Sequence, residues 1–168
     1  FDTNGRAYSV QTHTLPSARS QGEPLSGRID LTAGSKVTQL ALADEAAKWV
    51  LATSYGYGFI TKHGDLLGRN KAGKSVVNLG EAELLPPVEI VDSELSRIAV
   101  AASTGHLLVF EARQLPELAR GKGNKLVQIP PAQLEDGHRV TAICVLPPLH
   151  SLRVIAGKRH LTLSPSDL

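Results

Sequence analysis

The segment with the clearest chemical pattern is a glycine-rich basic stretch in the middle of the chain. Residues 68–75, Gly-Arg-Asn-Lys-Ala-Gly-Lys-Ser, satisfy the G-x-x-x-x-G-K-[ST] pattern of phosphate-binding loops. In such loops, backbone amides and a helix N-terminus surround the phosphates, the lysine reaches them and the hydroxyl holds Mg²⁺. Here residues 76–79, Val-Val-Asn-Leu, favour a strand instead of that helix, and no suitable magnesium aspartate follows. We interpret the stretch as a basic glycine turn; a phosphate-loop enzyme stays as an alternative that measurable nucleotide binding would support.

Other catalytic patterns are weak. Cys144 lies in an apolar run, which favours a buried, unreactive thiol, and Trp49 lies among strand residues, which favours a core position. Nothing resembles a nucleophile elbow. With seven aromatic residues in all, binding of single strands by base stacking is poorly supported. The histidines form no i,i+4 pair and have no cysteine companion, so we expect no metal site from His13, His63, His106, His138, His150 and His160.

The charge distribution indicates a polyanionic partner. The net charge is only +2, from 18 Lys and Arg and 16 Asp and Glu, but eleven of the bases and one acid fall in segments 17–28, 68–74, 119–125 and 153–159. Such clustering is typical of a polyanion-binding face rather than of a surface that only needs solubility. Lys and Arg in glycine turns suit contact with duplex phosphates, because the backbone can approach closely and add amide donors. The side chains that we predict to bind are Arg19, Arg28, Arg69, Lys71, Lys74, Arg120, Lys122, Lys125, Lys158 and Arg159.

The chain also repeats itself. Similar segments begin at Gly5, Gly56, Gly105 and Gly157, at intervals of 51, 49 and 52 residues. Each of the first three glycines is followed 13 to 15 residues later by an arginine in a glycine-containing turn, namely Arg19, Arg69 and Arg120. Three of the four basic segments are therefore one feature that occurs three times. We predict repeats over approximately 5–55, 56–104 and 105–156, with a partial repeat over 157–168.

Within a repeat the pattern is one of short strands. β-Branched or alternating runs are punctuated by Gly, Pro, Asn and Asp, while residues 44–48 favour a hairpin end over a helical turn. Four strands in a unit of this size are typical of a propeller-type blade, and a sandwich would not explain the repeat. We expect neighbouring blades that cover each other's apolar faces, with the basic turns along one rim. The expected strands are 7–10, 24–31, 37–43, 48–52, 58–61, 75–79, 88–92, 97–102, 106–112, 125–129, 140–146 and 152–156.

Length and composition set the class of protein. The 168 residues suit one globular domain with a sizeable core. A single cysteine excludes a disulfide scaffold and indicates a reducing compartment, so we expect a cytoplasmic location. No apolar run approaches a membrane span and no signal-peptide pattern opens the chain. Because the chain starts at Phe1 and has no methionine, we expect it to be a piece of a longer protein.

These residues resemble a known family. Segments 5–29, 56–79 and 105–130 are similar to successive repeats of the C-terminal domain of bacterial type IIA topoisomerase A subunits, closest to the topoisomerase IV branch, and 157–168 fits the opening of another repeat. The resemblance spans nearly the whole chain. It implies an all-β pinwheel of propeller-like blades, of which the chain holds roughly three and a fraction, whose basic rim binds and bends duplex DNA.

The resemblance also implies a parent enzyme. That enzyme uses ATP and Mg²⁺ to pass one duplex through a double-strand break in another, and works as an A-subunit dimer with a B subunit in the bacterial nucleoid. Its active-site tyrosine and ATPase lie in other regions, so we expect no catalytic residue and no cofactor in this chain. Tyr8, Tyr55 and Tyr57 are accordingly not interpreted as nucleophiles.

One departure from the family pattern favours topoisomerase IV. The gyrase version carries a QRRGGKG box that enforces full wrapping of DNA, and the nearest stretches here, 19–23 and 120–125, do not match it. Glu23 even places an acid in the first turn. We therefore expect weak bending rather than tight wrapping. The alternatives are a gyrase-type wrapping domain and a propeller-type module whose rim binds an acidic protein.

Overall fold

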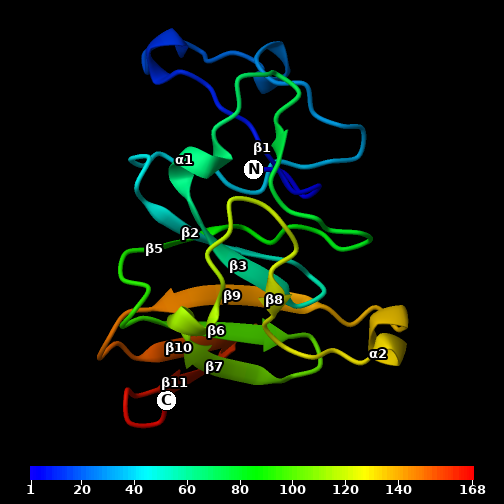
Figure 1. The fold of residues 1–168 in the computed structure, drawn as a ribbon, viewed down its shortest axis with the longest axis vertical. Helices are drawn as coiled ribbons and strands as arrows, with labels where there is room; N and C mark the ends of the chain where they lie inside the picture. The colour runs from blue at the N-terminus through cyan, green and yellow to red at the C-terminus, as the bar shows by residue number, and fades with distance from the viewer.

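The computed structural model describes residues 1–168 as an all-β molecule, as the sequence predicts (Figure 1). Its longest helix has five residues, and none of its helices has the length or apolar character needed to traverse a bilayer. The helical elements are η1 (Thr12–Thr14), η2 (Leu25–Gly27), α1 (His63–Leu66), η3 (Ala112–Gln114) and α2 (Pro131–Glu135). The strands are β1 (Arg6–Ala7), β2 (Lys48–Ala52), β3 (Tyr57–Lys62), β4 (Lys74–Ser75), β5 (Val88–Ile90), β6 (Arg97–Ala102), β7 (Leu107–Glu111), β8 (Asn124–Lys125), β9 (Val140–Leu146), β10 (Leu152–Ala156) and β11 (Arg159–Leu163).

The sheets form a series of blades that exchange strands. The second blade is a four-stranded antiparallel sheet in the order β5-β2-β3-β8, so its outermost strand comes from the following repeat. The first blade uses the same scheme, because β1 pairs with β4 and an isolated bridge joins Asp2 to Val37. The third blade has the order β7-β6-β9, and the hairpin β10-β11 starts a fourth. In the first two blades the outer strand therefore ties the blade to the next repeat.

The repeat glycines close equivalent hairpin turns. Gly5, Gly56 and Gly105 have φ angles of 72°, 80° and 84°, the left-handed region that favours glycine. Each donates its amide to the carbonyl three residues earlier. Because these turns recur at the spacing seen in the sequence, the repeat has a direct structural basis.

The hydrophobic core lies between consecutive blades. On β2, Trp49 and Leu51 face the first blade, where they join Val76 in one buried cluster. Val50 on the same strand faces the third blade and joins Ile98 in another cluster. Strands buried on both faces read as continuous apolar runs, which is why β2 and β6 have the bounds predicted from the sequence. Each blade thus covers its neighbour, and Trp49 is a core residue as predicted.

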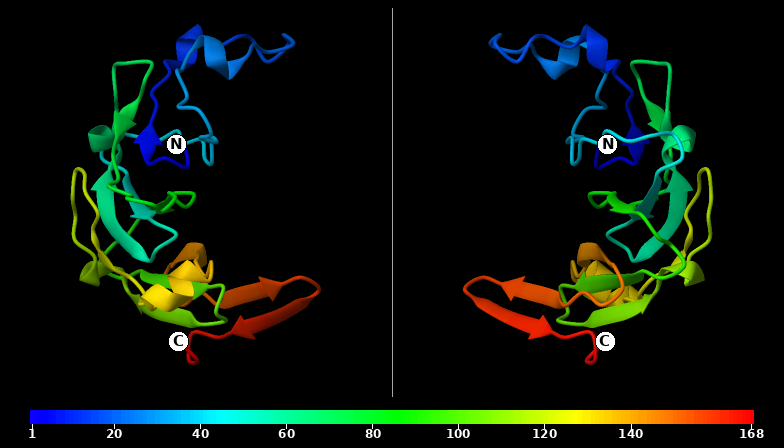
Figure 2. Two further views of the ribbon diagram at one scale, coloured as in Figure 1. Left: turned by 90° about the vertical axis from the view of Figure 1, so that its right-hand side faces the viewer. Right: turned by 90° about the vertical axis from the view of Figure 1, so that its left-hand side faces the viewer.

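The blades follow an arc, and two segments extend from it (Figure 2). Loops 68–75 and 115–125 lie on the convex side, while the 15–24 segment and the β10-β11 hairpin reach toward the open side. The predictions of strands over 24–31 and 37–43 are wrong: the first forms η2 and irregular backbone, and the second makes only the bridge at Val37. Residues 24–31 take the position in the repeat that the outer strands β4 and β8 take in the next two repeats, but they pair with no strand.

Candidate nucleic-acid interface

The basic loop 68–75 is held in place by hydrogen bonds between cationic side chains and backbone carbonyls. The ammonium of Lys74 donates to the carbonyl of Asp65 at 2.5 Å, and that of Lys71 donates to the carbonyl of Gly27 at 3.2 Å. From the first hairpin, the Arg6 guanidinium donates to the carbonyls of Ala72 (2.8 Å) and Gly73 (3.3 Å). Much of the positive charge here therefore satisfies backbone oxygens.

The basic loop 119–125 is placed by backbone pairing. Gly121 accepts a hydrogen bond from the amide of Asn78 at 2.8 Å and donates to the carbonyl of Val76 at 3.3 Å. The loop then enters β8, where Lys125 is paired with Tyr57 of β3. The cations of this loop make no hydrogen bond to protein carbonyls; the ammonium of Lys122 lies 3.9 Å from the centroid of the Tyr57 ring.

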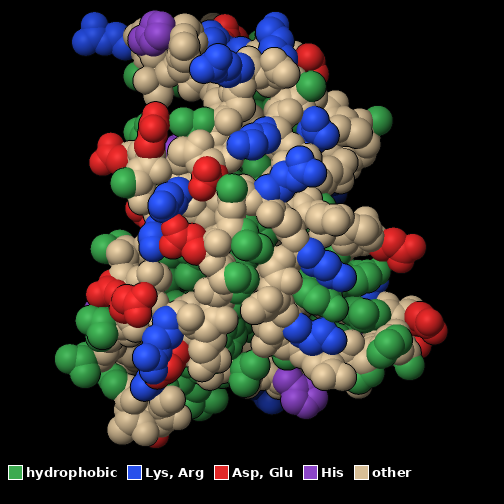
Figure 3. Space-filling model, viewed as in Figure 1, with side chains coloured by type: hydrophobic (Ala, Val, Ile, Leu, Met, Phe, Trp, Pro, Cys, Tyr) green, Lys and Arg blue, Asp and Glu red, His purple; other side chains and the backbone are tan.

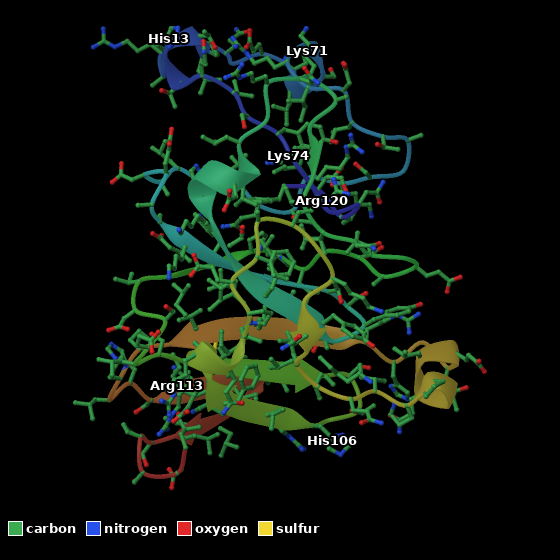
Figure 4. All side chains as sticks on the ribbon, viewed as in Figure 1. His13, Lys71, Lys74, His106, Arg113 and Arg120 are labelled. Atoms are coloured by element: carbon green, nitrogen blue, oxygen red, sulfur yellow. The ribbon has the colours of Figure 1, made fainter.

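The two loops share one face of the molecule. Figure 4 shows Lys71, Lys74 and Arg120 one below the other, and Figure 3 shows Lys and Arg spaced along that part of the face. The bridge between Val77 and Gly121 brings the second loop directly beside the strand that follows the first. Two basic turns about 50 residues apart thus form one surface, which we call the basic track and define as Arg69, Lys71, Lys74, Arg120, Lys122 and Lys125.

None of the six cations of the basic track forms an ion pair, and four of them also make no hydrogen bond to the protein. The ion pairs of the structure involve none of Arg69, Arg120, Lys122 and Lys125, and all four are exposed. Two lysines outside the basic track are neutralised, because Glu117 binds Lys48 at 2.7 Å and Lys62 at 3.5 Å. The hydrogen bond from Lys48, aided by the charge of Lys62, lowers the pKa of Glu117. The basic track is therefore the part of this face with unpaired positive charge.

Four predicted residues are not part of the basic track as defined, although one of them, Arg28, lines a hollow together with Lys71. Arg28 pairs with Glu23 and donates to Thr14, so its guanidinium is already engaged. Arg19 belongs to the segment that reaches toward the open side of the arc. Lys158 and Arg159 lie at the β10-β11 turn, which follows the repeat glycine and is not one of the long basic loops. The structure thus brings together the second and third basic segments, places Gly27 and Arg28 at the end of the first segment beside Lys71, and leaves Arg19 and the fourth segment separate.

Some residues of the interface were missed by reasoning from charge. Asn4 and Asn78, which were not predicted, line a hollow of about 550 Å³ together with the predicted Arg120 between the first two blades, and the walls of this hollow are mostly polar. Tyr57 and Arg6 each follow a repeat glycine, and each contacts the basic loop of the next repeat. Their common position after the glycine was visible in the sequence, but the strand exchange that brings the loop to them was not.

The phosphate-loop pattern does not form a phosphate-loop fold. Residues 74–75 are strand β4, and Val76 and Val77 continue as extended chain into the core. No helix N-terminus is present to receive phosphates, and two carbonyls of the loop are bound by Arg6. The interpretation as a basic glycine turn agrees with this geometry.

The remaining reactive groups do not form a site. Burial raises the pKa of the Cys144 thiol, so less of it is in the reactive thiolate form at neutral pH. The structure groups no three His, Cys, Asp or Glu side chains in a way that could hold a metal ion. The hydroxyl of Tyr8 is partly buried and donates to the carboxylate of Asp2 at 2.9 Å, and burial, together with this hydrogen bond, raises the pKa of Tyr8.

Strand-exchanging blades with basic loops on the convex side define a pinwheel-type β-propeller domain with a cationic face. A family model described as the DNA gyrase C-terminal domain, beta-propeller, matches residues 3–44, 47–85 and 103–145. The chain belongs to this family. Each matched stretch contains one of the glycines Gly5, Gly56 and Gly105.

The relatives are topoisomerase subunits. The chain is 41% identical over 170 residues to the A subunit of DNA topoisomerase 4 from Haemophilus influenzae, covering 100% of this chain and 23% of that protein. It is 40% identical to the Escherichia coli K12 protein of the same name, covering 99% of this chain and 22% of the relative. The chain thus spans less than a quarter of these relatives.

Solved structures agree with this assignment. The structure of the E. coli ParC C-terminal domain matches with a TM-score of 0.90 and 37% identity, covering 99% of this chain and 68% of that one. A DNA gyrase A C-terminal domain matches with a TM-score of 0.70 at 15% identity, covering 98% of this chain and 53% of that one, which supports the fold. The resemblance to the topoisomerase IV branch is confirmed by these comparisons.

Proposed function

We propose that this chain binds duplex DNA through the basic track. The observation that carries the proposal is the set of four exposed cations on one face that have neither an acidic partner nor a hydrogen bond to the protein, contributed by two loops that the blade repeat brings side by side. Cations spaced along a surface suit phosphates spaced along a duplex, and such contacts are independent of sequence. The similarity to the A subunit of DNA topoisomerase 4 supports the same function.

Within a longer protein, we propose that the domain positions and weakly bends DNA for strand passage. In this proposal, cleavage, ATP and Mg²⁺ belong to other regions and to a B subunit, in a cytoplasmic enzyme that contains two A subunits. The absence of the QRRGGKG box supports weak bending over gyrase-type wrapping. A rim that binds an acidic protein is the rival function, since the same cations would serve it.

The test is a titration of a labelled duplex of mixed sequence over a salt series. If the four unpaired cations contact phosphates, log Kd should rise with log salt with a slope of about 3 to 4, near 0.9 per contact. A scrambled duplex of the same length should bind equally well. An acidic polypeptide of equal charge serves as the competitor. Binding that this polypeptide displaces more readily than unlabelled duplex does would contradict the proposal and favour the protein-interaction function.

A further inference from the structure

The residue after each of the first two repeat glycines contacts the basic loop of the next repeat. In the first blade this residue is Arg6, which donates to the carbonyls of Ala72 and Gly73. In the second blade it is Tyr57, which has two ammonium groups near its ring: Lys122 at 3.9 Å and Lys125 at 5.7 Å from the centroid. Arg6 and Tyr57 occupy the same position in the repeat, but only Tyr57 has two lysine ammonium groups close to its side chain.

The backbone pairing of β3 with β8 places Lys122 and Lys125 beside Tyr57. Lys125 is the strand partner of Tyr57, and the amide of Leu126 donates to the carbonyl of Gly56 at 2.7 Å. Gly123, with φ of 76°, lies so close to Gly58 that only a glycine fits. The lysines on either side of Gly123 are thereby brought to one aromatic ring.

The arrangement concentrates charge that has no partner within the protein. Neither Lys122 nor Lys125 forms an ion pair, and both are exposed. Two ammonium groups repel each other, so their convergence needs a compensating attraction, which the negative face of a phenol ring supplies. An anion that bridged both ammonium groups would complete the site. A backbone phosphate has the charge and the acceptor oxygens for this role.

We propose that Tyr57 is a positioning residue that holds Lys122 and Lys125 together as a receptor for one backbone phosphate of duplex DNA. The inference rests on the proposed function of the basic track and adds a neutral residue to it. Tyr57 contributes no charge of its own. It orders two flexible side chains before binding, so that less conformational entropy is lost when the phosphate arrives.

The experiment compares Tyr57→Leu, Tyr57→Phe and the wild-type chain in the duplex titration. We expect Tyr57→Leu to weaken binding about 5-fold, which is about 1 kcal/mol, while Tyr57→Phe stays within about 2-fold of the wild type because it keeps the ring. The slope of log Kd against log salt should change by less than about 0.5 for both, because every cation is retained. Tyr55→Leu is the matched control: Tyr55 lies under Arg139, whose guanidinium is bound to the carbonyls of Leu134 and His138.

A double-mutant cycle separates positioning from folding. In a Lys122→Ala, Lys125→Ala background, the change from Tyr57 to leucine should no longer affect DNA binding. If the loss of affinity persists in that background, or if the Tyr57→Leu chain binds like the wild type, the inference is wrong while DNA binding stands. If the wild-type chain fails to bind duplex at any salt, the proposed function fails first. Should the Tyr57→Leu chain not fold, pentafluorophenylalanine at position 57 keeps the ring shape and reverses its electrostatics, and unchanged binding by that variant would equally overturn the inference.

Discussion

The loops 68–75 and 119–125 occupy equivalent positions in successive repeats but treat their cations differently. In the first, Lys71 and Lys74 donate to protein carbonyls, and Arg6 reaches into the loop as well. In the second, Lys122 and Lys125 face an aromatic ring and remain free to bind a ligand. The exchange of strands is the same in both, since β4 and β8 complete the preceding blades in the same way. A shared backbone scheme thus carries two different surface chemistries.

The difference shows that counts of basic residues overstate the charge available to DNA. A lysine that satisfies a carbonyl must give up that hydrogen bond, or share it, before it can bind a phosphate with full strength. Each loop has three bases, yet the first has one unengaged cation, Arg69, while the second has three. We therefore expect the second loop to contribute more to DNA binding and the first more to the stability of the fold.

The largest effect should come from the glycines where the loops meet the blades. An alanine Cβ at Gly123 would lie 2.0 Å from the carbonyl oxygen of Gly58, whereas at Gly73 its nearest contact is the Tyr8 ring at 2.7 Å. At Gly123 the backbone itself must move to admit the Cβ, whereas at Gly73 the Tyr8 side chain can shift in part. We expect Gly123→Ala to lower the free energy of unfolding by about 3 kcal/mol or more and Gly73→Ala by about 2 kcal/mol.

Gly105→Ala is the control for this measurement by chemical denaturation. Gly105 also has a positive φ, of 84°, but nothing lies within 4 Å of an added Cβ. Gly105→Ala should therefore lower the free energy of unfolding only by the cost of placing alanine at a positive φ, about 1 kcal/mol. Equal losses at all three glycines would mean that the close approach of the loops to the blades is not what these glycines permit.

The next effect compares the two loops by charge removal. Replacing Arg120, Lys122 and Lys125 together by alanine should flatten the salt slope of duplex binding by about 2 to 3 units with little loss of stability. The matched variant, Arg69, Lys71 and Lys74 to alanine, should flatten it by about 1 unit, since only Arg69 is free of protein partners.

Stability provides the complementary measurement. The variant of the first loop should lose about 1 to 2 kcal/mol of unfolding free energy, because two hydrogen bonds to the carbonyls of Gly27 and Asp65 are removed. Sequence preference should stay unchanged in both variants. If the triple variant of the first loop flattened the salt slope of duplex binding more than the triple variant of the second loop, the assignment of roles to the two loops would be reversed.

A smaller effect is expected at Arg6. Its guanidinium donates to the carbonyls of Ala72 and Gly73, so Arg6→Gln should lower the unfolding free energy by about 1 kcal/mol. Lys36→Gln removes an exposed cation whose ammonium has no partner and serves as the control for charge alone. In both Arg6→Gln and Lys36→Gln, DNA affinity should fall by no more than about 3-fold, because each variant loses one weak electrostatic contribution. A loss of binding confined to Arg6→Gln and larger than this would instead place Arg6 among the DNA contacts.

The sequence was sufficient where structure depends on apolar runs and glycines. Strands buried on both faces, such as β2 and β6, were predicted with their observed bounds, and the repeat glycines marked the hairpins. The strand predicted over 24–31 was wrong because an outer strand takes its structure from a partner in another repeat, not from its own residues. The DNA-binding residues stay predictions.

For the candidate site, the sequence showed which residues are basic, but not which groups of the protein their side chains bind. The sequence treats Lys74 and Lys125 alike, but Lys74 donates to the carbonyl of Asp65 in its own repeat, whereas strand exchange puts Lys125 beside the ring of Tyr57. Arg28 likewise counts as a base in the sequence, whereas Glu23 and Thr14 bind it in the structure. Arg28 lies only five residues from Glu23, and Lys74 nine from Asp65, but whether such groups meet depends on the backbone conformation between them, which the residue types alone do not fix.

The smallest effect concerns the base of the second loop, where Glu117 binds Lys48 and Lys62. The hydrogen bond from Lys48 holds the pKa of Glu117 below its usual value of 4.5. A carboxylate whose pKa is lowered by folding stabilises the native state above its unfolded pKa, and this contribution is lost as the pH falls through the folded pKa. Because the pair is largely exposed, Glu117→Gln should lower the unfolding free energy by only about 0.5 kcal/mol at pH 7.

The pH dependence of the difference in unfolding free energy between the wild type and Glu117→Gln shows whether it arises from charge or from packing. Between about pH 5 and 7 the wild-type chain should exceed the Glu117→Gln variant in unfolding free energy by a constant amount, and the difference should vanish once the pH falls below the lowered folded-state pKa of Glu117, where the carboxyl group is protonated. High salt at pH 7 should shrink it as well, because exposed ion pairs are screened. The matched variant Glu111→Gln removes an exposed pair with Arg113 away from both loops. If the difference at Glu117 persisted at low pH, it would arise from packing of the side chain, and the second loop would then be anchored by shape rather than by charge.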